Sequence, residues 1–193
     1  MKKILILPLF LIFVVMIFGY DNNKIIKKEG TPDDITKQMT VIEVKFYNFA
    51  GQNETGVIVV NKKYSEELKK IFSELYTIKY PIEKIVPISE YYWDDDKSMA
   101  DNNTSCYNYR VVKDSKKLSD HSYGAAIDIN PKYNPMIIAG KIYPENGIYD
   151  IKNKGTILKN SEIVKIFRKY GWKWGGEYKT LKDYQHFYKD RKR

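Results

Sequence analysis

The stretch SDHSYGAAIDINP occupies residues 119–131 and holds His121, one of only two histidines in the chain. Asp128 follows His121 by seven residues. Apolar and polar side chains alternate from Ala125 onward, so we predict a strand that buries Ile127 and holds Asp128 on the opposite face. Gly124 permits a backbone turn that brings His121 back towards Asp128. The stretch therefore predicts a turn and a strand that present an imidazole and a carboxylate together.

The second histidine, His186, lies sixty-five residues later and has its own carboxylate, Asp183, three residues before it. Two imidazoles and one carboxylate suit Zn²⁺, and three protein ligands leave a fourth position open, as in catalytic zinc sites. We therefore take His121, Asp128 and His186 as candidate metal ligands and the spare Asp183 as a candidate base. The alternative is two unrelated histidines in the core or on the surface. The carboxylate beside each histidine argues against it.

Hydrophobic periodicity predicts an α+β fold, with a small antiparallel sheet flanked by helices. Residues 41–47 alternate as a half-buried strand, and residues 57–60 form its hairpin partner after a turn at 51–56. A helix begins at Ser65 as its N-cap and is ended by Pro81. A second helix, capped by Asn160 or Ser161, stops at Gly171.

Several other segments carry weaker signals. We expect a strand at residues 82–88, and another around Arg110 in which Arg110 and Asn108 share a face. The aspartates at 94–96 lack the spacing of a calcium loop and are expected in a solvated acidic turn. Residues 132–156 are rich in proline and glycine and are expected to form a long loop bordering the site. Residues 189–193 are interpreted as a solvated tail.

The chain is expected to hold one domain. Residues 1–19 begin with Lys2 and Lys3, continue as an apolar run, and predict a signal peptide or an uncleaved N-terminal membrane anchor. Ile17 fits the cleavage rule poorly, which keeps the anchor open. Residues 20–39 are polar and interpreted as a linker, and residues 40–193 as the catalytic domain.

The amino-acid composition indicates which binding partners the protein has. The formal net charge of +9 favours anionic surroundings, which for an exported protein means cell-wall polymers. The lysines are scattered and no nucleic-acid-binding module is evident, so we expect no nucleic-acid partner. The single cysteine, Cys106, excludes an intramolecular disulfide and is expected to be a small buried residue. We expect a monomer, although no sequence feature bears directly on the oligomeric state.

The residues also carry a resemblance to a known family. Ser119, His121, Gly124, Ala126 and Asp128 fill the pattern S-x-H-x-x-G-x-A-x-D, and a later carboxylate-x-x-His follows near the C-terminus. Residues 40–188 resemble the zinc D-alanyl-D-alanine carboxypeptidase and L-alanyl-D-glutamate endopeptidase family, which cuts peptidoglycan stem peptides. Flanking residues around 103–110, 128–131 and 171–187 resemble its endopeptidase-like branch, which includes phage endolysins.

The resemblance implies the hedgehog- and DD-peptidase-like zinc peptidase fold, with His121, Asp128 and His186 holding zinc. It also implies that Asp183 is the general base and that Arg110 steadies the substrate carbonyl. Zinc lowers the pKa of bound water from about 16 towards about 7 and polarises carbonyls. Candidate substrate contacts are Ser119, for which a plain turn role is equally compatible, and Trp174, which faces either the core or a groove. Relatives often carry cysteine immediately before the arginine, where this chain has Tyr109.

Two functions follow as expectations. The first is an exported or membrane-anchored zinc peptidase outside the cytoplasm, acting on peptidoglycan peptides by endopeptidase, carboxypeptidase or dipeptidase cleavage. The second is a wall-binding or signalling module that keeps zinc without turnover. Asp183 and Arg110 favour the enzyme, since a binder needs neither.

Overall fold

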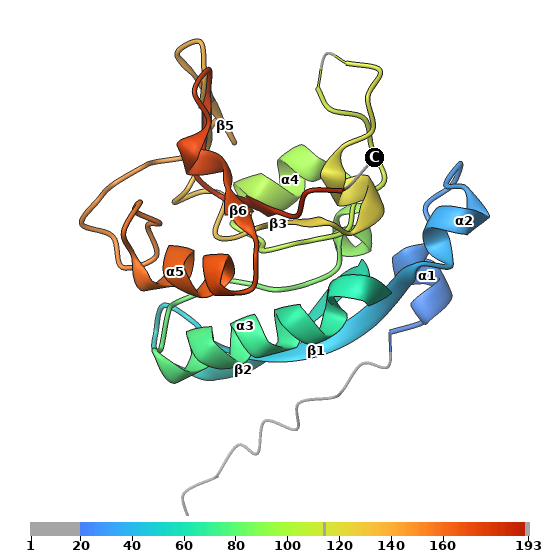
Figure 1. Ribbon diagram of the computed structural model, residues 1–193, viewed down its shortest axis with the longest axis horizontal. Coiled ribbons are helices and arrows are strands. Elements are labelled where there is room, and N and C mark those ends of the chain that lie inside the picture. Colours follow the sequence, from blue (N-terminus) through green and yellow to red (C-terminus); the bar gives the residue numbers. More distant parts are fainter. Residues whose placement is uncertain (1–19, 114, 192–193) are drawn as a thin grey trace, which may run out of the picture.

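A long antiparallel hairpin forms the base of the fold (Figure 1). The computed structural model describes residues 20–113 and 115–191, so the expected export segment lies outside it. In the hairpin, β1 (Met39–Tyr47) pairs with β2 (Asn53–Asn61), and Ile42 lies opposite Ile58. Ile42, Val44 and Phe46 are buried, which confirms the predicted alternation. β2 begins earlier than predicted, because the turn closes between Asn48 and Gln52.

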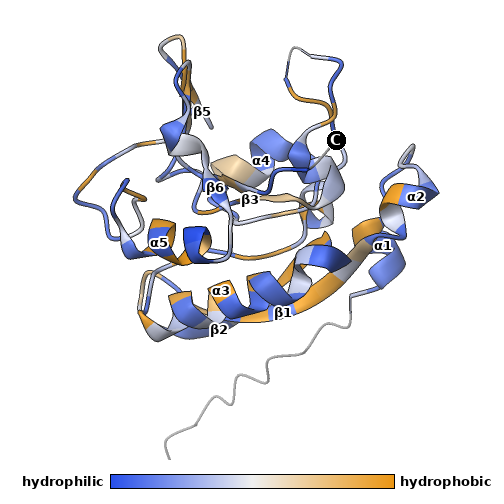
Figure 2. Cartoon of the chain, viewed as in Figure 1, coloured by the Kyte–Doolittle hydropathy of each residue, from blue (hydrophilic) through white to orange (hydrophobic). Residues whose placement is uncertain are grey.

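One helix covers this hairpin. A short 3₁₀ turn, η1 (Lys62–Tyr64), leads into α3 (Ser65–Thr77), which packs against β1. Ser65 is not the N-cap that we predicted: it is the first helical residue, and its hydroxyl donates to the carbonyl of Lys62 at 2.9 Å. Orange apolar positions alternate with blue hydrophilic ones along α3 (Figure 2), as expected for a helix with one buried face.

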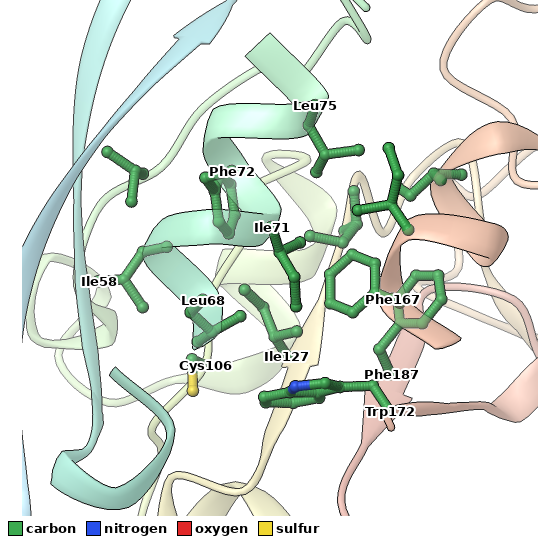
Figure 3. Packing of buried hydrophobic residues seen from close by; sticks show 14 of the residues in the cluster. Ile58, Leu68, Ile71, Phe72, Leu75, Cys106, Ile127, Phe167, Trp172 and Phe187 are labelled. Atoms are coloured by element: carbon green, nitrogen blue, oxygen red, sulfur yellow. The ribbon is translucent and has the colours of Figure 1, made fainter. Parts of the chain in front are cut away.

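A second helix completes the main core (Figure 3). α5 (Glu162–Lys169) packs against α3, and Gly171 after it has a left-handed φ of 74°, the predicted helix stop. Phe167 of α5 stacks on Phe187 with 3.9 Å between ring centroids, and Trp172 packs edge-on against Phe167. These aromatic rings join the C-terminal part of the chain to α3 and to the fully buried Ile127.

The remaining strands are short and antiparallel. One sheet has the order β3-β8-β6, from β3 (Ala126–Asp128), β8 (His186–Tyr188) and β6 (Lys173–Trp174). Another has the order β5-β4-β7, from β5 (Lys141–Tyr143), β4 (Met136–Ile138) and β7 (Lys182–Asp183). The α+β class is therefore confirmed, with three small sheets in place of one. Two further 3₁₀ turns are η3 (Asp120–Tyr123) and η4 (Gly175–Glu177).

Three segments differ from their expected structure. Residues 82–88 form no strand, because Pro81 and Pro87 bound them and lack the N–H that a ladder needs; η2 (Ile88–Tyr91) follows. The segment around Arg110 is extended but lies outside the named strands. The long loop at 132–156 contains the β4–β5 hairpin.

The segment expected to be a linker is also structured. It holds α1 (Asn22–Ile26) and α2 (Asp33–Thr36), whose Ile25 and Ile35 are buried in a small cluster with Met39 of β1. Each helix contributes too few apolar residues for a periodic pattern to be visible in the sequence. Among residues 20–113 and 115–191, no helix combines the length and apolar character needed to cross a bilayer.

Residues 189–191 pack on the domain, so this described part of the expected tail is not solvated. The backbone N–H of Lys189 donates to the carbonyl of Ala125 at 2.9 Å, and its ammonium group lies 2.6 Å from Glu67. Arg191 pairs with Asp120 at 2.9 Å, beside His121 in sequence. The basic composition of residues 189–191 gave no indication that Lys189 and Arg191 pair with acidic residues of the domain.

Candidate metal centre

His121 is held by a tight 3₁₀ turn, η3. The hydroxyl of Ser119 caps the turn by accepting the backbone N–H of His121 at 3.3 Å, and Gly124 ends it at φ 57°. The carbonyl of Gly124 then accepts the N–H of Asn61 at 3.3 Å, which ties the turn to β2. In the ring of His121, Nδ1 lies 2.6 Å from the carbonyl of Cys106 and therefore donates to it, so Nε2 is left with its lone pair.

Asp128 and His186 meet through strand pairing. β3 and β8 are antiparallel, and Asp128 lies directly opposite His186. Nδ1 of His186 is 2.9 Å from one carboxylate oxygen of Asp128, while Nε2 of His121 is 3.2 Å from the other. The two ring nitrogens are themselves 3.2 Å apart. One donor atom from each residue lies within 4.8 Å of the other two.

The charges within this group are strongly coupled. Burial raises the pKa of Asp128, but the charges and hydrogen bonds of His121 and His186 outweigh it and hold that pKa well below its usual range. Burial lowers the pKa of His186, yet its hydrogen bond to Asp128, with the charge of Asp183, leaves that pKa raised. A carboxylate that stays ionised between two imidazoles is suited to a cation.

Asp183 provides a second acidic group beside these three residues. It lies on β7, whose partner β4 pairs Met136 with Asp183, so the hairpin within residues 132–156 positions this residue. Burial and the neighbouring Asp128 raise the pKa of Asp183 to about 6, against the lowering effect of His186 and His121. Its buried Oδ1 has no hydrogen-bond partner among the described residues. A buried carboxylate oxygen without a donor is costly unless a ligand or a cation completes it.

The residues present fit zinc. Two imidazole nitrogens and a carboxylate oxygen converge, and the carbonyl of Cys106 fixes the ring of His121 from behind, so that Nε2 of His121 offers its lone pair. Nδ1 of His186 offers a lone pair once a metal replaces the proton that it shares with Asp128. The predicted convergence of His121, Asp128 and His186 is therefore what the structure contains. Cys106 is buried and contributes its backbone, not its thiol, whose pKa is raised by burial.

Arg110 is bound into the wall beside His121. Its backbone N–H donates to the hydroxyl of Ser122 at 2.9 Å, and its carbonyl accepts that hydroxyl at 2.6 Å and the N–H of Ser119 at 3.0 Å. The N–H of Asn108 donates to the carbonyl of His121 at 3.2 Å. The segment carrying Arg110 therefore runs along the turn that carries His121.

The side chain of Arg110 reaches α4 (Asp95–Ala100), where Nη2 lies 2.9 Å from Asp95. The acidic segment is thus not the solvated turn that we expected: Asp94 caps α4 and Asp95 binds Arg110. Asn108 donates to the same carboxylate at 3.0 Å, which bears out the shared face of Asn108 and Arg110. Neither Asp95 nor Ser122 was identified from the sequence, since a run of three aspartates and a lone serine are common on solvated surfaces.

The two expected substrate contacts differ in outcome. Ser119 is buried and serves as the cap of η3, which is the turn role left open for it. Trp174 is only 3% exposed, and its indole N–H donates to the carbonyl of Tyr184 at 2.8 Å, so it belongs to the core and faces no groove. The reason is local: the chain at Gly175 and Gly176 folds tightly against Asp183 and the indole ring.

A groove of about 920 Å³ opens beside α4. It is lined by residues of α4, by Lys113, and by the β5 strand and the turn after it, with Asp94 and Asp96 on either side of Asp95. The ammonium group of Lys113 lies 4.3 Å from the ring centroid of Tyr143, so the two walls meet at that point. The metal-ligand candidates do not line this groove.

Comparison with known proteins agrees with this geometry. The family model described as D-alanyl-D-alanine carboxypeptidase matches residues 113–189, which include His121, Asp128, Asp183 and His186 but not Arg110. The fold, the clustered ligands and this match define the chain as a hydrolase of the metallopeptidase class. This part of the chain is similar to the D-alanyl-D-alanine carboxypeptidase family, as the motif resemblance indicated. No solved structure matches the chain.

Proposed function

We propose that the protein is a zinc-dependent peptidase that hydrolyses an amide bond in peptidoglycan stem peptides outside the cytoplasmic membrane. The observation that carries this proposal is the convergence of His121, Asp128 and His186 next to the buried, unpaired carboxylate of Asp183. Zinc bound by the first three residues would supply Lewis acidity, which polarises a carbonyl and activates water. The match of residues 113–189 to the D-alanyl-D-alanine carboxypeptidase family model supports the same reaction type.

Asp183 is the proton carrier in this proposal. A general base works best when its pKa lies near the working pH, and burial raises the pKa of Asp183 to about 6. Oδ1 takes the proton of the attacking water and delivers it to the leaving amine. Proton transfer of this kind contributes about 10² to 10⁴ in rate. A pure binding module has no need of a buried carboxylate without a partner, because such a group only lowers stability.

Arg110 supports the substrate carbonyl. Its Nη2 is engaged by Asp95, and its Nη1 makes only a long contact of 3.5 Å to the carbonyl of Val111, so the guanidinium retains a donor for a substrate oxygen. The groove beside α4, lined by the two neighbours of Asp95 in the chain, gives room for an extended peptide. Removal of one such donor costs about 10² to 10³ in turnover, so Arg110→Ala should impair kcat while leaving the zinc content unchanged.

Export and the wall substrate rest on charge and on the N-terminal segment. The formal charge of +9 favours polyanionic cell-wall polymers, and the apolar run at residues 1–19 suits a signal peptide or an anchor. The chain also lacks a second cysteine, so folding outside the cytoplasm needs no disulfide. We propose peptidoglycan peptides as the partner and a monomer as the working form.

The test is digestion of purified murein sacculi with and without a chelator, followed by mass spectrometry of the released products. Release of free D-alanine would identify a carboxypeptidase, and release of stem peptides cut after L-alanine an endopeptidase. Asp183→Asn is the matched inactive variant, because it keeps the shape of the side chain. If the wild-type protein binds sacculi but releases no chelator-sensitive product, the non-catalytic binding module replaces the enzyme.

A further inference from the structure

The carboxylate of Asp95 binds Asn108 and Arg110 at the same time, and the proposed reaction assigns it no role. Both of its oxygens are used: Oδ1 accepts the amide N–H of Asn108 at 3.0 Å, and Oδ2 lies 2.9 Å from Nη2 of Arg110. Both partners come from the extended segment that runs along the turn of His121. The side chains of Asp95 and Arg110 are 25% and 26% exposed, so water screens this pair less than a surface ion pair.

Asp95 is held firmly from its own side. It is the first residue of α4, and the carboxylate of Asp94 caps the helix by accepting the N–H of Lys97 at 3.0 Å. At the other end of α4, the thioether of Met99 accepts the amide N–H of Gln185 at 3.6 Å. Gln185 precedes His186, and its carbonyl accepts the N–H of Ile129, the neighbour of Asp128, at 3.0 Å. α4 thus contacts both Arg110 and the residue before His186.

A guanidinium held on one edge presents its remaining donors in a fixed direction. Arginine loses considerable rotamer freedom when it is ordered, and a carboxylate on Nη2 removes that freedom before substrate arrives. Asp95 leaves Nη1 with only a long contact of 3.5 Å to the carbonyl of Val111, while the buried Nε has no partner among the described residues. Nη1 is therefore the group that a substrate oxygen can take.

We propose that Asp95, seated by Asn108, is a positioning residue that orients the guanidinium of Arg110 towards the substrate carbonyl. The proposal rests on the proposed function, since it requires that Arg110 act on a substrate. Asp95 touches no reacting atom and acts only through Arg110. Its loss should therefore lower kcat and should leave KM, zinc content and folding nearly unchanged.

The experiment is a double-mutant cycle on zinc-loaded protein with a peptidoglycan stem peptide as substrate. Asp95→Ala should lower kcat about ten- to a hundredfold, below the loss caused by Arg110→Ala, because the arginine is displaced and not removed. In the Arg110→Ala background, Asp95→Ala should change kcat less than about twofold. Asp95→Asn serves if the alanine variant folds poorly, as judged by urea unfolding.

Two controls separate positioning from general damage. Asp33, on α2, forms a different ion pair, with Lys27 at 3.1 Å. Asp33→Asn breaks that pair and should leave kcat unchanged. Added guanidinium should partly restore the activity of Arg110→Ala only while Asp95 is present. An equal loss from Asp95→Ala in both backgrounds, or no loss where Arg110→Ala is impaired, overturns the proposal for Asp95 alone. An inactive wild type overturns the proposed function and this inference with it. Full activity of Arg110→Ala overturns the role of Arg110 and this inference, and leaves the peptidase itself in place.

Discussion

Replacement of Asp183 by asparagine should inactivate the peptidase and yet stabilise its metal-free form at neutral pH. The carboxyl group is buried, and burial together with Asp128 raises its pKa from 3.8 to about 6. A raised pKa means that folding favours the protonated acid. Between pH 4 and 6 the folded state binds a proton that the unfolded state has lost, so stability falls as the pH rises through this interval.

The magnitude follows from the same interval. At 1.36 kcal/mol for each pH unit, the ionised carboxylate of Asp183 costs about 3 kcal/mol of stability above pH 6. Asparagine keeps the unpaired oxygen but carries no charge. The Asp183→Asn protein should therefore gain about 1 to 3 kcal/mol at pH 8, and the gain should shrink to nearly zero by pH 4.

Urea unfolding in chelator, from pH 4 to pH 8, measures this difference directly. The charge of Asp183 raises the pKa of His186, so the difference between wild type and Asp183→Asn includes this effect on His186. Asp33→Asn provides an exposed aspartate whose removal should change stability by less than about 0.5 kcal/mol. A difference between wild type and Asp183→Asn that stays constant across the pH range would refute the reasoning. So would an Asp183→Asn protein that is less stable than wild type at pH 8.

Three further outcomes test other parts of the structure. Gly124→Ala should lower the free energy of unfolding in urea by about 2 to 4 kcal/mol, since φ is 57° and the new Cβ would lie 2.5 Å from the backbone nitrogen of Asn61. Gly140 has a similar φ of 76° but open space around it, so Gly140→Ala should lower the same free energy by only about 1 to 2 kcal/mol. Ile127→Ala, in the fully buried core, should cost about 2 to 5 kcal/mol by the same method. The pH–rate profile of kcat/KM should lose activity below about pH 6, as Asp183 becomes protonated; a flat profile down to pH 4 would contradict its role as base.

The sequence was most informative where periodicity and motif spacing agree. The hairpin of β1 and β2, the buried faces of α3 and α5, and the metal-ligand candidates were all predicted, because each depends on local spacing and on burial of one face. The short strands were harder to predict. Strands of two or three residues, such as β6 and β7, are too brief to show alternation and exist only because distant segments pair with them.

Trp174 and Asp95 were misjudged for a related reason. A tryptophan near a glycine pair fits a groove wall as well as a core, and only the approach of Gly176 to its ring decides between them. An aspartate in an acidic run looks solvated until a distant arginine is folded onto it. For Asp95 the deciding contact links two segments that no spacing rule connects, and for Trp174 it depends on the backbone conformation of the glycine pair.

Strand register is what makes the metal centre possible. Asp128 and His186 face one another because β3 and β8 pair Ala126 with Tyr188 and Ile127 with Phe187. Side chains alternate along a strand, so a slip of one residue would turn the imidazole of His186 into the core and expose Phe187. Phe187 is fully buried against Phe167, which makes such a slip costly. The hydrophobic core therefore fixes the position of a metal ligand through its immediate neighbour in the chain, and the loss of Phe187 should weaken zinc affinity as well as stability.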